Sequence, residues 1–87
     1  MKHNFSAGPC ILPAEVMEKS SEAIVNYNNT GLSLIEISHR SHDFIQIMDK
    51  AVNLSISLLG LEGKGYKALF LQGGASLQFI SVAYNLL

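Results

Sequence analysis

The sequence predicts an α/β fold in which two helices precede a buried strand, a tight turn and a further helix. Two stretches, residues 13–27 and 41–59, repeat apolar side chains at helical spacing. A short apolar run at 67–71 is followed by a pair of glycines, as expected for a strand that is covered on both faces. The residues after this pair, 76–87, are apolar again and predict the next helix.

The composition of the chain excludes several classes of protein. The chain has 87 residues, of which 48% are hydrophobic, and a formal net charge of −1. Such a balance, with no cluster of lysine and arginine, argues against a nucleic-acid-binding surface or a polybasic membrane patch. A single cysteine, Cys10, cannot form an internal disulfide, and no stretch has the ~20 apolar residues that a membrane span requires. We therefore expect a cytoplasmic protein, or part of one, in a reducing compartment.

The first predicted helix follows an extended arm, residues 1–12, that contains turn-forming residues. Pro13 suits the first helical position, where a backbone N–H would be unpaired in any case. A turn at residues 28–31 ends the helix. Its apolar face is expected to hold Val16, Met17, Ser20, Ala23, Ile24 and Tyr27.

The second predicted helix follows a segment, residues 31–40, that we expect to be extended, either as a short strand or as an ordered loop. Ser41 is the expected N-cap and Gly60 the expected stop. Several faces of this helix are apolar, which predicts heavy burial. The main stripe consists of Phe44, Met48, Ala51, Val52, Ser55, Leu58 and Leu59.

The turn after the predicted strand is a candidate anion site. Gly73 and Gly74 allow positive φ and a close approach by another molecule. Ser76 is expected to be the N-cap of the following helix, where unpaired N–H groups and the positive end of the helix dipole favour a phosphate or a carboxylate. The alternative is an ordinary strand-turn-helix connection that holds no ligand.

The densest polar group in the sequence is the segment 38–43. It contains His39, His42 and the only arginine of the chain, Arg40, whose planar fork of donors matches carboxylate or phosphate. No further ligands complete a metal site, so we expect no metal here. A Ser/His/Asp triad is conceivable from the residue types, but no nucleophile-elbow pattern surrounds a serine. A surface loop with ordinary helix capping remains the alternative to an anion site.

The end of the sequence predicts that more residues belong to the same fold. The chain stops inside an apolar helical pattern, and a buried strand requires neighbours on both edges. We therefore expect residues 1–87 to be an incomplete N-terminal portion of a larger protein, with no internal domain boundary.

Three motifs in this order resemble the phosphoserine aminotransferases, a family of fold-type I enzymes that use pyridoxal 5'-phosphate (PLP). They are Asn4-Phe5-Ser6-Ala7-Gly8-Pro9 with Leu12-Pro13-Ala14-Glu15-Val16, then Glu36-Ile37-Ser38-His39-Arg40 with Phe44-Ile45, and then Phe70-Leu71-Gln72-Gly73-Gly74-Ala75-Ser76-Leu77-Gln78-Phe79. The resemblance covers essentially the whole chain. It implies an N-terminal arm, two helices, and the first strand and helix of the large mixed-sheet domain of that fold.

The resemblance also implies site residues. The cofactor-phosphate turn of the family falls on Ala75 and Ser76, with Gly74 just before them, and some members have Gly-Arg in place of Ala-Ser. The substrate-anion motif falls on His39 and Arg40, which in such dimers can face the active site of the partner subunit. Some relatives also have a serine where this chain has Ala7, so a side-chain contact from that position is not carried over.

What the resemblance implies for function is amino transfer in a cytoplasmic homodimer, between L-glutamate and 3-phosphohydroxypyruvate, with O-phosphoserine as the aminated product. The resemblance thus implies a role in serine biosynthesis, and enzymes of this family also act in pyridoxine biosynthesis in many bacteria. The lysine that forms the Schiff base has no counterpart in this chain, which holds no catalytic residue and is expected to be inactive by itself. The alternative from another functional class is a stand-alone anion-binding or interaction module without catalysis.

Overall fold

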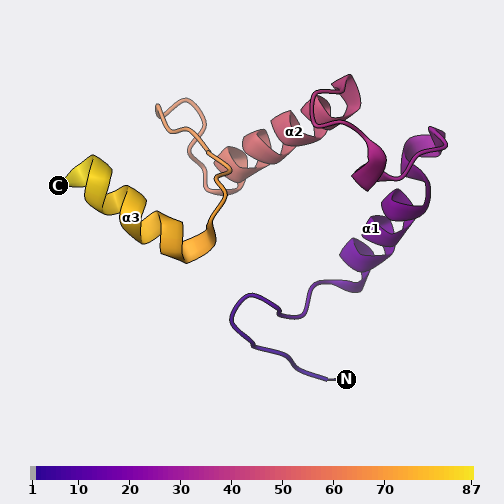
Figure 1. The fold of residues 1–87 in the computed structure, drawn as a ribbon, viewed down its shortest axis with the longest axis horizontal. Helices are drawn as coiled ribbons and strands as arrows, with labels where there is room; N and C mark the ends of the chain where they lie inside the picture. The colour runs from indigo at the N-terminus through magenta and orange to yellow at the C-terminus, as the bar shows by residue number, and fades with distance from the viewer. Residues whose placement is uncertain (1) are drawn as a thin grey trace. The chain divides into compact units, whose positions relative to one another are not determined.

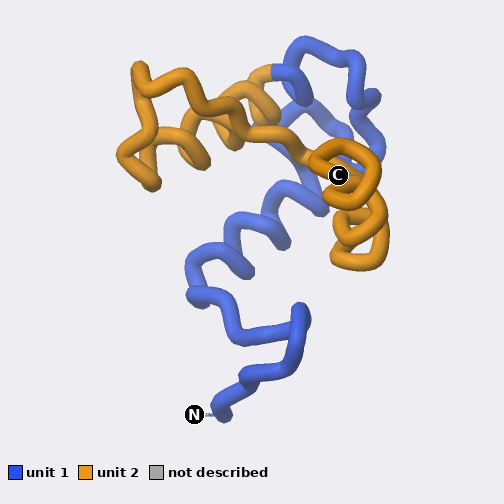
Figure 2. Tube along the Cα trace, turned by 90° about the vertical axis from the view of Figure 1, so that its left-hand side faces the viewer, with its two compact units in different colours: residues 1–45 blue, residues 46–87 orange. Residues whose placement is uncertain are grey.

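The structure, a computed structural model, describes residues 2–87. They form three helices and two short 3-10 turns (Figure 1). In chain order these are α1 (Ala14–Asn26), η1 (Tyr27–Asn29), η2 (Leu34–Glu36), α2 (His42–Leu58) and α3 (Gly74–Leu86). The chain divides into two compact units, Met1–Ile45 and Gln46–Leu87, and the division falls inside α2 (Figure 2).

Helix α1 confirms the first predicted helix, with a start shifted by one residue. Pro13 precedes the helix, with φ −53° and ψ 139°, so the prediction that it is the first helical residue is wrong by one position. Its carbonyl accepts hydrogen bonds from the N–H groups of Val16 and Met17, at 3.0 and 3.4 Å. Because proline has no backbone N–H, no unpaired donor is left at the residue that precedes this helix.

The segment between α1 and α2 is not extended throughout, because a capping box folds part of it into η2. Ser33 Oγ accepts the N–H of Ile35 at 3.3 Å, and Glu36 Oε2 accepts the N–H of Ser33 at 2.8 Å. Ser33 is also buried. The expectation of an extended segment is therefore wrong at Leu34–Glu36. The serine and glutamate three residues apart are the sequence signal of this box.

Both ends of α2 lie where the sequence predicts them. Ser41 Oγ accepts the N–H of Phe44 at 3.3 Å, as an N-cap does. At the other end Gly60 has φ 65°, its N–H donates to Ser57 O, and the N–H of Leu61 donates to Ile56 O. These two bonds form a Schellman motif, which pairs carbonyls that the end of a helix leaves free.

The apolar stripe of α2 is half-buried rather than buried. Its half-buried residues follow helical spacing and are Phe44, Ile47, Met48, Ala51, Val52, Ser55 and Ile56. Leu58 and Leu59, which the sequence placed on the same stripe, are 83% and 72% exposed. No apolar side chain is buried among residues 2–87, so the prediction of heavy burial is wrong for this chain taken alone.

The predicted strand has no partner, and in its place the chain runs without regular secondary structure into α3 (Figure 1). A strand exists only through hydrogen bonds to a neighbouring strand. Among the described residues the single β-type pairing is an isolated antiparallel bridge between Phe5 and Cys10. The local apolar signal at Leu69 and Phe70, which are 75% and 58% exposed, is therefore not sufficient to form a strand here.

The exposure of these apolar surfaces leads to a first prediction, for the 87-residue chain in isolation. We expect it to bind the dye ANS strongly and to unfold without a cooperative heat-absorption peak, because its helices expose apolar faces and bury none. Dye fluorescence and scanning calorimetry measure this. A single sharp transition with an enthalpy of about 60 kcal/mol, the value usual for a folded domain of this length, would contradict it.

Candidate functional site

The turn at the start of α3 is built by two glycines with positive φ. Gly73 has φ 96° and is the N-cap, and Gly74, with φ 55°, begins the helix. The positive φ predicted for this pair is confirmed. The prediction that Ser76 is the N-cap is wrong, because the helix already begins two residues before it.

The N-terminus of α3 presents main-chain donors. Its first hydrogen bond joins the N–H of Leu77 to Gly73 O at 3.2 Å. Within residues 2–87, the N–H groups of Gly74, Ala75 and Ser76 have no acceptor, as expected for the first turn of a helix. A Cβ placed on Gly74 would meet nothing within 4 Å, so this side of the turn is open. Three free donors at the positive end of a helix fit the anionic oxygens of a phosphate.

Gly73 is required at this turn for a second reason besides its backbone angle. A Cβ at position 73 would overlap the side chain of Leu77, one helical turn further on. The residue that shapes the turn therefore also allows Leu77 to fold back over it.

The segment 38–41 forms a β-turn with His39 and Arg40 at its two central positions. The N–H of Ser41 donates to Ser38 O at 2.9 Å and closes the turn. Ser38 Oγ accepts the N–H of Arg40 at 3.2 Å, which is a second fixing point inside the same turn. Both central residues are exposed, and α2 begins directly after the turn.

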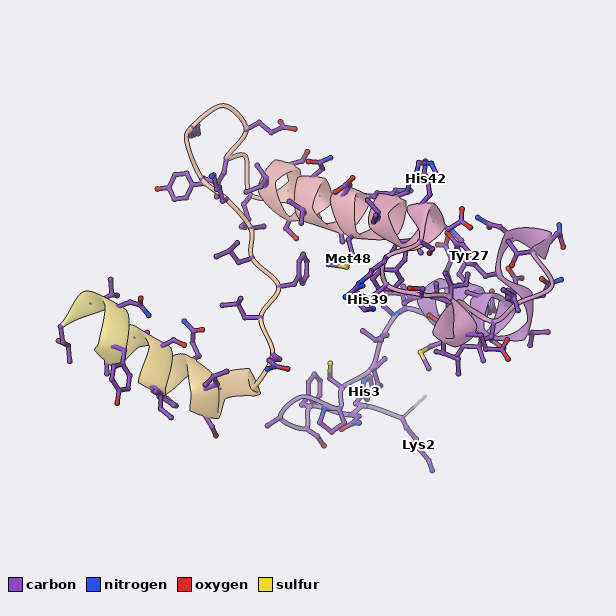
Figure 3. The ribbon with its side chains drawn as sticks, turned by 45° about the horizontal axis from the view of Figure 1, so that its top comes forward. Lys2, His3, Tyr27, His39, His42 and Met48 are labelled. Carbon is purple, nitrogen blue, oxygen red and sulfur yellow. The ribbon has the colours of Figure 1, made fainter. Side chains whose placement is uncertain are left out.

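The positively charged guanidinium of Arg40 is available to bind a ligand at this turn. Among the described residues the ion pair present is that of Lys19 with Glu15, 2.7 Å apart on exposed α1, so Arg40 is engaged by no carboxylate there. His39 and His42 project to different sides of the chain (Figure 3). Across residues 2–87, no three His, Cys, Asp or Glu side chains group as metal ligands would.

The two groups of predicted site residues lie in different units of the structure. His39 and Arg40 belong to the first unit, whereas Gly74, Ala75 and Ser76 belong to the second. Within each unit the residues of one group lie together and form a candidate anion site.

No family model matches the chain. The phosphoserine aminotransferase of Flavobacterium psychrophilum is 65% identical over 86 residues, which are 99% of this chain and 24% of that protein. The solved phosphoserine aminotransferase of Bacillus circulans subsp. alkalophilus is 46% identical, with a TM-score of 0.79 over 87% of this chain and 21% of its own. The PLP-bound enzyme of Trichomonas vaginalis is 37% identical, with a TM-score of 0.84 over 95% of this chain and 24% of its own.

The resemblance to phosphoserine aminotransferases is confirmed. The chain spans about a quarter of the length of the relatives it matches. The predicted fold class is confirmed with it, since both structural neighbours are phosphoserine aminotransferases and the one from Trichomonas vaginalis is PLP-bound. None of the helices of residues 2–87 combines the length and the apolar character needed to cross a membrane.

Sequence reasoning missed one organising residue, in the arm that precedes α1. Asn4 Oδ1 accepts both the N–H and the hydroxyl of Ser6, at 3.0 and 2.7 Å, and Asn4 Nδ2 donates to Pro9 O at 2.8 Å. The sequence indicated turn chemistry in this arm but not the asparagine that closes it. Asparagine ahead of a serine two residues on is the signal that an Asx-turn offers.

A second prediction concerns Gly73. We use a chimera in which this chain replaces the matched 86 residues of the Flavobacterium psychrophilum enzyme. In it, Gly73→Ala should lower the free energy of unfolding by about 2–5 kcal/mol, because alanine is disfavoured at positive φ and its Cβ also overlaps Leu77. Chemical denaturation measures the change.

The matched control is Gly65→Ala. Gly65 has φ 80° but open space around its Cβ position, so this variant should lose only about 1–2 kcal/mol. Equal losses in the two variants would show that overlap with Leu77 plays no part at the turn.

Proposed function

We propose that this chain provides two anion anchors of a PLP-dependent phosphoserine aminotransferase. The observation that carries the proposal is the 65% identity to such an enzyme along 99% of this chain. The complete protein would transfer an amino group between L-glutamate and 3-phosphohydroxypyruvate in serine biosynthesis, and in many bacteria in pyridoxine biosynthesis as well. The alternative of an anion-binding module without catalysis is favoured by no specific observation.

The first anchor is the start of α3, where Gly74, Ala75 and Ser76 would hold the phosphate of PLP. Their N–H groups are free among the described residues and the approach to Gly74 is open, which supports this assignment. When bound, the cofactor supplies an electron sink for the bonds at the amino-bearing carbon. The contribution of this chain is to fix the phosphate end and thereby the orientation of the ring.

The second anchor is the turn with His39 and Arg40, which would bind an anionic group of the substrate. The guanidinium supplies a planar pair of donors for a carboxylate or phosphate, and the imidazole adds one more. Binding at both ends orients the substrate at the reacting carbon, where small displacements are costly to the rate. In a homodimer, His39 and Arg40 of one subunit would serve the active site of the other.

The remaining functional groups would come from outside this chain. The five lysines here are at positions 2, 19, 50, 64 and 67, and none corresponds to the Schiff-base lysine of the family. We accordingly propose that residues 1–87 do not transaminate alone. The proposed setting is the cytoplasm, with small-molecule substrates and a second copy of the complete protein as partners.

The third prediction tests the substrate anchor. In the chimera, Arg40→Ala should raise the KM for the anionic substrates by about 10- to 100-fold, which corresponds to one hydrogen bond to a charged group, and should change kcat much less. Arg40→Lys should lie between, since it keeps the charge but loses the fork. Steady-state kinetics measure both constants, and a KM that stays the same in Arg40→Ala would remove Arg40 from the substrate site.

The fourth prediction tests the cofactor anchor with a binding readout. Ser76→Glu places a negative charge among the donors and should weaken PLP binding by about 5- to 1000-fold, because like unit charges about 4 Å apart repel by about 1–4 kcal/mol. The Kd comes from titration of the apoenzyme by fluorescence, and the ³¹P resonance of the bound phosphate should shift.

The matched variant Ser76→Ala keeps the main-chain N–H and removes the hydroxyl, so it separates the two donors. If main-chain donors provide the binding, this variant should bind PLP nearly as the parent does. A loss of about 10- to 100-fold would mean that the hydroxyl also donates to the phosphate, since one hydrogen bond to a charged group contributes about 1.5–3 kcal/mol. If Ser76→Glu binds PLP as the parent does, the phosphate is held elsewhere.

A further inference from the structure

We propose that Ser38 is a positioning residue for Arg40, fixing the main chain from which the guanidinium reaches the substrate anion. This inference rests on the proposed function of Arg40 and adds a residue to it. Ser38 closes the turn on which Arg40 lies through its carbonyl, and it also accepts the N–H of Arg40 through its hydroxyl.

The two contacts of Ser38 act on different atoms of the turn. Its carbonyl accepts the N–H of Ser41 at 2.9 Å, which brings the ends of the turn together. Its hydroxyl accepts the N–H of Arg40 at 3.2 Å, which fixes the peptide group directly ahead of the Arg40 Cα. Removal of the hydroxyl therefore leaves the turn closed and frees only the peptide that carries Arg40.

The chain on both sides of this turn is held by bonds that do not involve Ser38. The capping box between Ser33 and Glu36 holds the approach to the turn, and Ser33 is buried. After it, Ser41 caps α2 through the N–H of Phe44. Within this frame, the Ser38 hydroxyl restrains the orientation of the Arg40 peptide.

The restrained main chain around the turn is important for anion binding, because Arg40 is exposed and no carboxylate among the described residues pairs with it. A long side chain on a mobile peptide loses conformational freedom when it binds an anion, and a fixed peptide reduces that loss. Loss of the hydroxyl should then weaken binding of the anion without altering the chemical step.

The experiment uses the same chimera with the active cofactor bound. Ser38→Ala should raise the KM for the anionic substrates by about three- to tenfold, the effect of one neutral hydrogen bond, with kcat nearly unchanged. The Kd of glutarate, a dicarboxylate that cannot be transaminated, should rise by the same factor in calorimetry. Ser38→Thr keeps the acceptor oxygen and should restore both values.

The matched control is Ser55→Ala. Ser55 donates its hydroxyl hydrogen to Ala51 O at 2.8 Å inside α2, so this variant also deletes one serine-to-backbone bond but lies outside the turn. Its KM and its glutarate Kd should remain those of the parent. A general effect of losing a serine hydrogen bond would instead raise these values in both variants and would overturn the proposal.

A double variant separates failure of this inference from failure of the proposed function. If Ser38 acts through Arg40, Ser38→Ala should have no effect in an Arg40→Ala background. Additive effects would mean that Ser38 acts by another route. If Arg40→Ala raises KM while Ser38→Ala does not, the positioning role fails and the anchor stands. If Arg40→Ala itself leaves KM unchanged, the proposed anchor fails.

Discussion

Short-range hydrogen bonds between side chains and the main chain are the constraint on which this structure depends. Every side-chain hydrogen bond of residues 2–87 joins residues at most five positions apart. No apolar side chain of the described residues is buried, so a hydrophobic core contributes nothing comparable. The turn that carries His39 and Arg40 is held by such bonds, whereas the start of α3 has no side-chain cap and depends on the backbone angles of its two glycines.

The two candidate sites present hydrogen-bond donors to an anion in different ways. At α3 the donors are main-chain N–H groups, and the side chains that matter are those that are missing at Gly73 and Gly74. A change of the side chains at the two following positions, Ala75 and Ser76, is then compatible with unchanged main-chain donors. At the second candidate site the proposed donor is the side chain of Arg40, and the hydroxyls of Ser38 and Ser41 hold main-chain N–H groups beside it.

The success of sequence reasoning follows the same division between local and non-local causes. The N-cap Ser41, the stop at Gly60 and the positive φ of the glycine pair were predictable because each depends on a few adjacent residues. The capping box of η2 was equally local, and the serine and glutamate three residues apart would have revealed it. The strand predicted at 67–71 does not form, because it requires a pairing partner that the described residues do not contain.

The difference between local and non-local interactions also affects how the proposed sites would bind their ligands. An anchor made by local bonds has its geometry before any ligand arrives, and less conformational freedom is lost on binding. The apolar faces of α2 and α3, in contrast, depend on contacts from elsewhere, since an apolar helix face stabilises the fold only when another surface covers it. Covering those faces would therefore fix where each anchor lies, while the shape of each anchor is already determined by its own few residues. The position of an anchor and its shape thus depend on different interactions. For this reason a single hydroxyl, such as that of Ser38, can affect anion binding although no hydrophobic core is involved.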